Sequence, residues 1–234
     1  MRKYGLLLLM FCSISFMGAN SAIAMEENSV SKESSGSAPS VMILGASYAR
    51  GWAIENIVGK TVVNSGVGGS QSHEMLARMS ESVLQDRPDV LIIWGFINDI
   101  FRSDKEKIES TLLDTRENFK QMVSLAKGLG VEVLLATEVT ISEPVRGWKD
   151  ELIAMAAKVM GKSSYQDYVN GHVRTTNDWI RQFAHEQGVV VLEFEKVLSG
   201  RDGYRKAEFS QADGSHLTQA AYDALTLYMR SAYR

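Results

Sequence analysis

Five short apolar runs, separated by segments with helical patterns, restrict the fold of this chain more than any other feature of its sequence. They occupy residues 41–44, 61–64, 90–94, 131–137 and 189–194. Residues 90–93 and 131–135 are largely apolar rather than alternating, which is typical of strands covered on both faces of a parallel sheet. The sequence therefore predicts an α/β fold with a sheet of five parallel strands.

Helical patterns fill the gaps between the later strands. In the first, apolar residues recur at steps of three or four residues or sums of these: Ile108, Leu112, Phe119, Met122, Val123 and Ala126. Gly128 and Gly130 follow and should end that helix. A second helix ends at Gly188 and has one apolar face, formed by Val173, Ile180, Phe183 and Ala184. The alternation of strands and helices favours a doubly wound α/β sheet over an all-β or helical-bundle fold.

The stretch from residue 143 to residue 170 has the least regular pattern. We expect one helix near residues 149–160 and a loop that flanks a pocket. Arg146 and Trp148 in this stretch are candidates for contacts with a sugar or an acyl group.

The first 24 residues predict a secretory signal peptide. Arg2 and Lys3 precede an apolar run over residues 5–17, and residues 22–24 form a small-x-small cleavage site. An uncleaved anchor is the alternative, but the run is short for a membrane-spanning helix of about 20 residues. We expect a mature protein that is periplasmic or secreted by a bacterium and has no stable membrane association after cleavage.

Residues 25–40 predict a flexible leader, because they are rich in Ser and Glu and contain no aromatic residue. The folded domain is therefore expected over residues 41–234. The only cysteine, Cys12, lies in the signal peptide, and the bulky Met10 and Phe11 before it do not fit a lipoprotein site. The mature chain then has neither a disulfide nor a thiol nucleophile.

The charge of the chain bears on its partners. With 45% hydrophobic and 23% charged residues the composition is that of a globular protein, and the formal net charge is -3. This charge argues against a nucleic-acid-binding surface. The sequence carries no signal for an oligomeric state.

Candidate functional residues follow three of the predicted strands. Ser47 comes just after the first, the glycine-rich stretch 66–69 after the second, and Asn98 after the third. Ligands of parallel α/β sheets bind beyond the carboxyl ends of the strands. We therefore expect these three segments to meet at one edge of the sheet.

Ser47 is the candidate nucleophile. On a tight turn from strand to helix its hydroxyl is exposed and its backbone N–H lies near a helix N-terminus, which suits a serine that forms an oxyanion. A helix cap is the alternative for a serine in this position.

Asp213 and His216, close to the C-terminus, are the candidate partners of that serine. A serine hydroxyl needs a base, and an aspartate three residues before a histidine can bind the other ring nitrogen of that base. Alternatively, Asp213 is a helix N-cap and His216 a surface histidine.

The segments 64–69 and 96–99 are candidates for binding a developing negative charge. Glycine-rich backbone offers N–H groups, and the Asn98 amide offers a further donor. Taken singly, a glycine-rich turn and an Asn-Asp turn or cap explain the same residues.

Together these segments resemble the SGNH/GDSL hydrolase family, whose serine, glycine, asparagine and histidine blocks occur here in the same order and at similar separations. The strongest match is Asp213-Gly214-Ser215-His216-Leu217-Thr218, followed by Ala220-Ala221-Tyr222. The strand that leads into Asn98 and Asp99 is the next best. The resemblance implies a three-layer α/β/α domain with a flavodoxin-like sheet.

The resemblance also implies roles for individual residues. Ser47 would be the nucleophile, His216 the base, and Asp213 the residue that orients the base. Gly69 and Asn98, with the N–H of Ser47, would form the oxyanion hole. Such a site needs no metal and no organic cofactor, and its substrate would be a small acyl ester such as an O-acetylated carbohydrate.

Two departures from the family pattern keep other functions open. Ala46 replaces the aspartate of the Gly-Asp-Ser block, and Phe96 replaces the glycine two residues before the asparagine, with Gly95 displaced by one. A bulky side chain at Phe96 could reshape the pocket. A non-catalytic carbohydrate-binding module and an O-acyltransferase of a cell-envelope polysaccharide are the alternatives to a hydrolase.

Other polar and aromatic residues have simpler interpretations. The histidines outside the matched block show no metal-ligand spacing: His73, His172 and His185. Glu138 ends the fourth strand, where we expect a solvated carboxylate that could reach the edge of the pocket. Trp52 is expected in the core.

Overall fold

The computed structural model describes residues 40–142 and 164–233. Contacts between residues divide the chain into two units, Met1–Gly36 and Ser37–Arg234, and all described residues belong to the second. The predicted signal peptide, the leader and the helix predicted near 149–160, with Arg146 and Trp148, lie outside the described residues.

The sheet has the strand order β2-β3-β1-β4-β5-β6. Its strands are β1 Ser40–Gly45, β2 Asn56–Ile57, β3 Lys60–Gly66, β4 Val90–Trp94, β5 Glu132–Ala136 and β6 Val190–Leu192. All pairs are parallel except β2–β3. The predicted strands correspond to the parallel ones, and their order is that of a flavodoxin-like fold. The predicted number of strands was wrong by one, because β2 adds a two-residue antiparallel edge strand.

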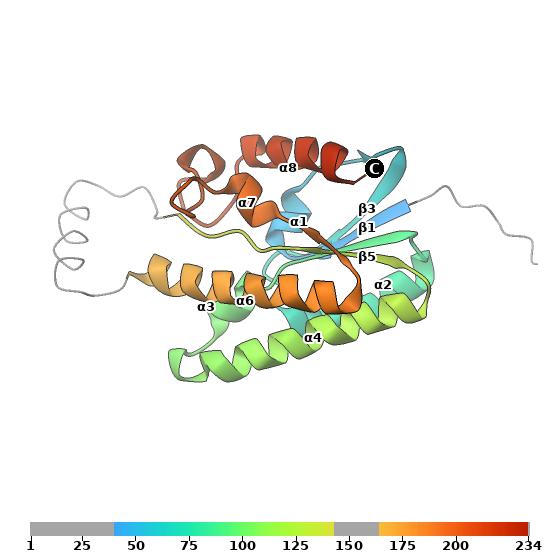
Figure 1. Cartoon of the computed structure of the whole chain (residues 1–234), viewed down its shortest axis with the longest axis horizontal. Coiled ribbons are helices and arrows are strands. Elements are labelled where there is room, and N and C mark those ends of the chain that lie inside the picture. Colours follow the sequence, from blue (N-terminus) through green and yellow to red (C-terminus); the bar gives the residue numbers. More distant parts are fainter. Residues whose placement is uncertain (1–39, 143–163, 234) are drawn as a thin grey trace, which may run out of the picture. The chain divides into compact units, whose positions relative to one another are not determined.

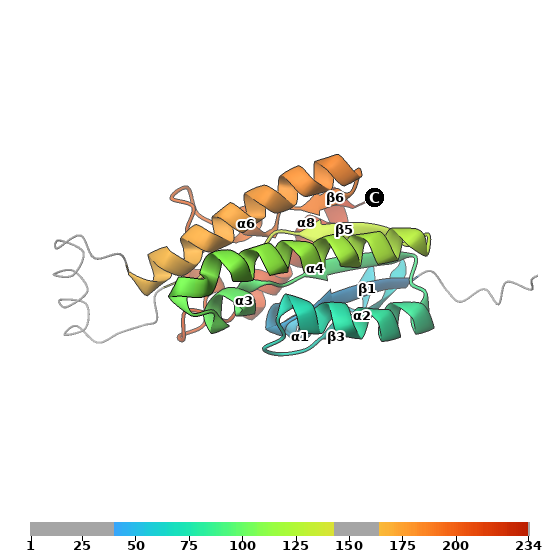
Figure 2. The ribbon, with the colours of Figure 1, turned by 90° about the horizontal axis from the view of Figure 1, so that it is seen from below.

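Helices cover both faces of this sheet, so the three predicted layers are confirmed. The α-helices are α1 Ser47–Gly51, α2 Ser72–Asp86, α3 Ile97–Arg102, α4 Ile108–Gly128, α6 Tyr165–Gln187, α7 Phe194–Leu198 and α8 Gln219–Ala232; short 3₁₀ turns are η1 Lys105–Lys107 and η2 Ala207–Phe209. Helices α2, α4 and α6 lie side by side on one face (Figure 2). Helices α7 and α8 lie on the other (Figure 1).

The long helices follow the predicted patterns. Every apolar residue predicted on the inner face of α4 is buried. Helix α6 begins with a capping box, in which the Ser164 hydroxyl accepts a hydrogen bond from the Asp167 N–H at 3.0 Å. It ends at Gly188, whose φ of 63° is the left-handed conformation that glycine adopts readily. Within the described residues, no helix is long and apolar enough to cross a membrane.

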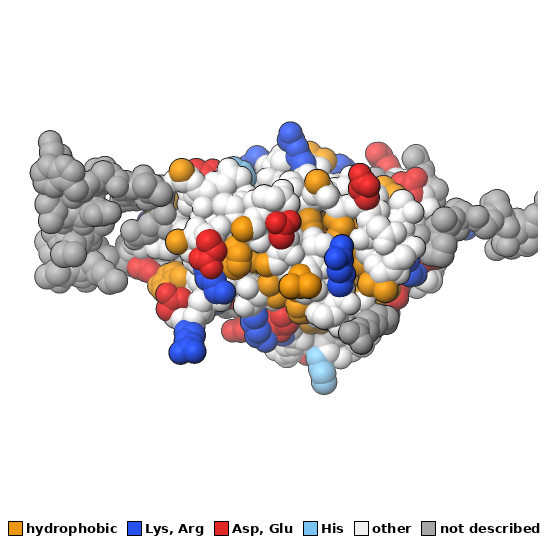
Figure 3. Space-filling view, turned by 90° about the horizontal axis from the view of Figure 1, so that it is seen from above, with side chains coloured by type: hydrophobic (Ala, Val, Ile, Leu, Met, Phe, Trp, Pro, Cys, Tyr) orange, Lys and Arg blue, Asp and Glu red, His pale blue; other side chains and the backbone are white. Residues whose placement is uncertain are grey.

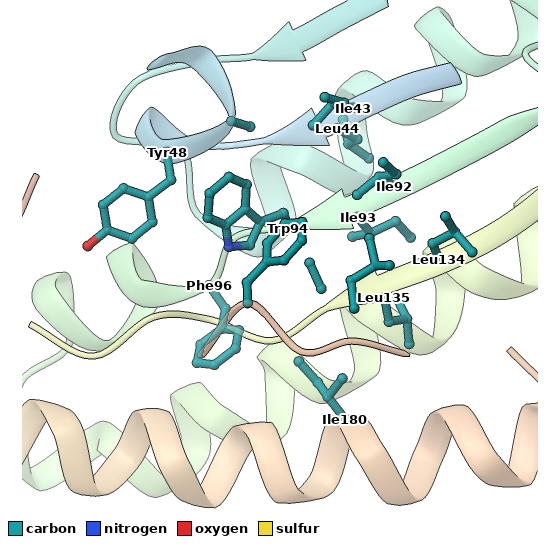
Figure 4. Close-up of a cluster of buried hydrophobic side chains, with 14 of the residues drawn as sticks. Ile43, Leu44, Tyr48, Ile92, Ile93, Trp94, Phe96, Leu134, Leu135 and Ile180 are labelled. Atoms are coloured by element: carbon teal, nitrogen blue, oxygen red, sulfur yellow. The ribbon is translucent and has the colours of Figure 1, made fainter. Parts of the chain in front are cut away.

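The central strands β1, β4 and β5 form the middle of the core. Apart from Ser40 and Glu132 at the strand starts, their residues are buried, among them Ile43, Ile92 and Leu134 (Figure 4). Burial on both faces explains why these strands appear in the sequence as continuous apolar runs. Trp52 is also buried, as predicted, and its indole N–H donates to the Thr226 hydroxyl of α8 at 2.9 Å.

Candidate active site

A cleft of about 680 Å³ lies at the carboxyl ends of the central strands. Ser47, Gly69, Asn98 and His216 all line it. These residues come from α1, the β3–α2 loop, α3 and the loop before α8. The structure thus brings together four of the five predicted site residues, and Asp213 is hydrogen-bonded to one of them.

Ser47 is the first residue of α1, and the N-cap position is held by Ala46. Its side chain is partly exposed and makes no hydrogen bond to any residue that the structure describes. The hydroxyl is therefore not used as a helix cap. It is free to react with a ligand in the cleft.

Asp213 holds the His216 ring in a fixed orientation. His216 Nδ1 lies 2.5 Å from Oδ2 of Asp213, and Oδ1 accepts the backbone N–H groups of Ser215 and His216, both at 2.9 Å. Partial burial raises the pKa of Asp213, but the hydrogen bonds from His216 and Ser215 outweigh it and hold that pKa well below its usual range. Asp213 is not a helix cap, because the N-cap of α8 is Thr218.

A buried arginine joins the histidine loop to the serine helix. Arg205 donates to the carbonyl oxygens of Gly214 and Ser215. The Ser215 carbonyl also accepts the Tyr48 hydroxyl at 2.6 Å. Burial raises the pKa of that hydroxyl, so Tyr48 remains a donor. Since Tyr48 follows Ser47 and Ser215 precedes His216, this contact positions the two candidate catalytic residues relative to each other.

The candidate oxyanion donors lie on the β3–α2 loop and in the first turn of α3. Gly69 has a φ of 78°, which strongly favours glycine. The Asn98 amide donates one of its two N–H groups to the carbonyl of Ser70 at 2.9 Å. The amide of Asn98 is thus fixed beside the glycine loop, and its second N–H is available to a ligand.

Asp99 connects this loop to two helices, a role that the sequence interpretation missed. It is 3% exposed, and its carboxylate accepts the Ser72 N–H at 2.9 Å, the Ser72 hydroxyl at 2.6 Å and the Thr115 hydroxyl at 3.1 Å. Burial raises the pKa of Asp99, although these hydrogen bonds oppose the rise. The carboxylate of Asp99 therefore links α3 to the first residue of α2 and to Thr115 in α4.

Replacement of Asp99 by Ala should lower the free energy of unfolding by on the order of 3 kcal/mol, because it leaves the buried N–H and hydroxyl of Ser72 without their acceptor. The Thr115 hydroxyl can still donate to the carbonyl of Thr111. Urea titration measures this loss. Asp178→Ala is the matched control: its side chain is 76% exposed, and we expect a change within about 0.5 kcal/mol. Equal small losses in both variants would contradict a structural role for Asp99.

Glu138 was predicted to be solvated, and this prediction was wrong. The side chain is completely buried, and burial raises its pKa. Its Oε2 accepts the backbone N–H groups of Phe96 at 2.9 Å and Ile97 at 3.3 Å. Glu138 thus satisfies the first N–H groups of α3, the helix that carries Asn98.

The two departures from the family pattern do not obstruct the cleft. Phe96 is fully buried and packs edge-to-face on Phe119, with ring centroids 6.2 Å apart (Figure 4). Gly95 has a φ of 145°, and a Cβ atom there would lie 3.3 Å from Cβ of the buried Ala46. The expectation that Phe96 reshapes the pocket is therefore wrong, since its side chain points into the core.

The arrangement contains the groups that acyl transfer through a serine requires: a free hydroxyl, an imidazole held by a carboxylate, and fixed N–H donors. Among the described residues, no three His, Cys, Asp or Glu side chains are grouped so that they could hold a metal ion.

Comparison with solved structures shows where this fold recurs. A protein assigned to the lipolytic G-D-S-L family of Desulfitobacterium hafniense is 18% identical and has a TM-score of 0.63, with 82% of this chain and 98% of that chain covered. A GDSL-like lipase from Bacteroides thetaiotaomicron is 18% identical with a TM-score of 0.59, covering 82% and 86%. An acetyl xylan esterase is 16% identical with a TM-score of 0.63, covering 83% and 100%. At these identities the similarity establishes the fold.

Sequence comparison identifies the family. No curated protein shows significant sequence similarity to the chain. The model of the GDSL-like Lipase/Acylhydrolase family, however, matches residues 35–224, which include every candidate site residue. Because this match spans most of the sequence, the chain belongs to the GDSL-like lipase/acylhydrolase family.

Proposed function

We propose that the protein is a serine ester hydrolase that acts through an acyl-serine. The observation that carries this proposal is the cleft in which the unbonded Ser47 hydroxyl and the His216 ring both lie, with Nδ1 of that ring bound to Asp213. The free Nε2 of His216 is the nitrogen that accepts the serine proton.

In the proposed reaction, His216 removes the proton of Ser47, and the serine oxygen attacks the ester carbonyl. The oxyanion is bound by the Asn98 amide and the backbone N–H groups of Gly69 and Ser47. When the tetrahedral intermediate collapses, His216 protonates the leaving alkoxide. A water activated by His216 then releases the acid and regenerates Ser47.

Hydrolysis is favoured over acyl transfer because the His216 side chain is 53% exposed, so water reaches the base directly. The substrate that we propose is a short acyl ester on a carbohydrate, in line with the fold shared with an acetyl xylan esterase. The binding-module alternative was based on Ala46 and Phe96. Phe96 no longer supports it, because its side chain lies in the core.

Export is a separate part of the proposal, supported by residues 1–24 alone. A mature N-terminus that begins at residue 25 in the periplasmic or culture fraction supports it. Detection of full-length protein only, in the cytoplasm, contradicts it.

Labelling with a fluorophosphonate probe tests the nucleophile. Mass spectrometry of the purified mature protein should show one adduct, on the peptide that contains Ser47. The adduct should be lost in Ser47→Ala, strongly reduced in His216→Ala, and retained in Ser231→Ala, which removes an exposed hydroxyl of α8. A folded protein without any adduct would instead support the binding module, with Ala46 as the residue to revert.

A further inference from the structure

Two arginines flank the glycine loop of the cleft. Arg50, three residues after Ser47 on α1, lines the cleft, and a Cβ atom at Gly68 would lie 3.1 Å from its Nη1. Arg102 ends α3, and a Cβ atom at Gly69 would lie 2.9 Å from its Nη2. Both guanidinium groups therefore lie against the loop that supplies the candidate oxyanion donor.

Neither guanidinium group has a hydrogen bond or an ion pair with a described residue, and both side chains are exposed. Arg181, by contrast, binds both Glu193 and Glu195. The field of Arg102 contributes to the lowered pKa of Glu74, but the main cause of that lowering is the hydrogen bond from the Gln71 N–H. The N–H donors of Arg50 and Arg102 thus remain available to a ligand.

The charge of the cleft differs from that of the rest of the molecule. Its described lining contains Arg50 and no aspartate or glutamate. The formal charge of the whole chain is -3, and acidic and basic side chains are interspersed over the face drawn in Figure 3. The nearby carboxylate of Asp213 is already bound by His216 and the N–H of Ser215, so the unpaired charge beside the candidate nucleophile is that of Arg50. Unpaired positive charge in a cleft attracts anions.

We infer that the alcohol part of the ester substrate carries an anionic group, a carboxylate or a phosphate, and that Arg50 and Arg102 bind this group. Guanidinium groups recognise both anions through paired N–H donors. The anion belongs to the alcohol because the proposed acyl group is short. Phe101, which also lines the cleft and is partly exposed, offers apolar surface for the rest of the substrate.

The inference rests on the proposed function for the identity of the reacting bond, but anion binding can be measured without hydrolysis. The probes are 4-acetamidobenzoate, 4-acetamidophenyl phosphate and the neutral methyl 4-acetamidobenzoate, whose amide bonds stand in for the ester. Isothermal titration calorimetry gives their dissociation constants with the wild-type protein. The matching acetate esters, assayed by chromatography of the phenol product, give kcat/KM.

We expect at least one anionic amide to bind about tenfold more tightly than the neutral amide, the size of effect that a charge-assisted hydrogen bond produces. The preference should shrink as salt is raised and fall to near unity in the double variant R50Q/R102Q. The matched control is R230Q, which removes an exposed arginine near the far end of α8 and should retain the preference. The stronger of the two anionic probes identifies the carboxylate or the phosphate as the natural group.

Equal or weaker binding of both anionic amides, or a preference that persists in R50Q/R102Q, overturns the inference. If the arginines serve only to stabilise the oxyanion, the double variant slows hydrolysis of anionic and neutral esters by the same factor. Anion-selective binding without ester turnover or a fluorophosphonate adduct would refute the hydrolase proposal and leave the anion site standing. Turnover of all esters without a preference for the anionic ones would refute the anion site and leave the hydrolase proposal intact.

Discussion

Replacement of Ser47 by alanine should reduce kcat for p-nitrophenyl acetate by about 10⁴-fold or more, because it removes the atom that forms the acyl intermediate. The fold should be unchanged. The Ser47 hydroxyl makes no hydrogen bond within the described structure, so its removal leaves no buried group unpaired. Turnover, the circular dichroism spectrum and urea unfolding of the variant test both statements together.

Ser231→Ala is the matched control for this prediction, since it deletes an exposed serine hydroxyl far from the cleft and should keep wild-type turnover. Unchanged hydrolysis in folded Ser47→Ala would eliminate the acyl-serine mechanism. A residual rate above that in water is expected, because oxyanion donors and substrate binding still contribute without the nucleophile.

The fold could be predicted because its defining strands are buried on both faces. Strand β4, fully buried over Val90–Trp94, leaves an apolar run that is legible in the sequence. Strand β2 could not be predicted, since its two residues, Asn56 and Ile57, are too few to show a periodicity, although Ile57 is buried and both pair with β3. The antiparallel pairing that defines β2 is visible only in the three-dimensional structure.

The meeting of Ser47, Gly69 and Asn98 at one edge could also be predicted, because each comes shortly after a strand of the parallel sheet. The residues that support the candidate site from below the surface could not be predicted. Glu138 and Arg205 are charged, and charged residues are usually exposed. Their burial depends on backbone partners that the residue pattern does not reveal: the N–H groups of Phe96 and Ile97 for Glu138, and the carbonyls of Gly214 and Ser215 for Arg205.

The orientation of Phe96 shows a different limit of sequence reasoning. The motif places a bulky residue beside the asparagine, which indicates an obstructed pocket. In the structure, the Phe96 side chain is fully buried and packs on Phe119, and the preceding Gly95 has a φ of 145°. The direction of this side chain, which spacing alone does not reveal, therefore decides whether the departure affects the site.

Replacement of Asp213 by asparagine should lower kcat by about 10³- to 10⁴-fold, because an amide can donate to Nδ1 of His216 and then favours the tautomer with a protonated Nε2. That tautomer cannot accept the serine proton. The change is nearly isosteric, and the backbone N–H groups of Ser215 and His216 can still be accepted by the amide oxygen. Asp223→Asn, which alters a carboxylate on α8 bound only to Gln219, is the matched control and should keep wild-type kcat.

The pH dependence separates orientation by Asp213 from a general effect of its charge. Since hydrogen bonds hold the pKa of Asp213 well below its usual range, the carboxylate stays ionised in the folded protein throughout the acid range in which an ordinary aspartate would be protonated. Above about pH 4, protonation of Asp213 should therefore make no contribution to the acid limb of the wild-type rate profile. In His216→Ala, adding Asp213→Asn should cause no further loss, because the two residues act as one unit. An additive loss would mean that Asp213 acts on the substrate independently of the histidine.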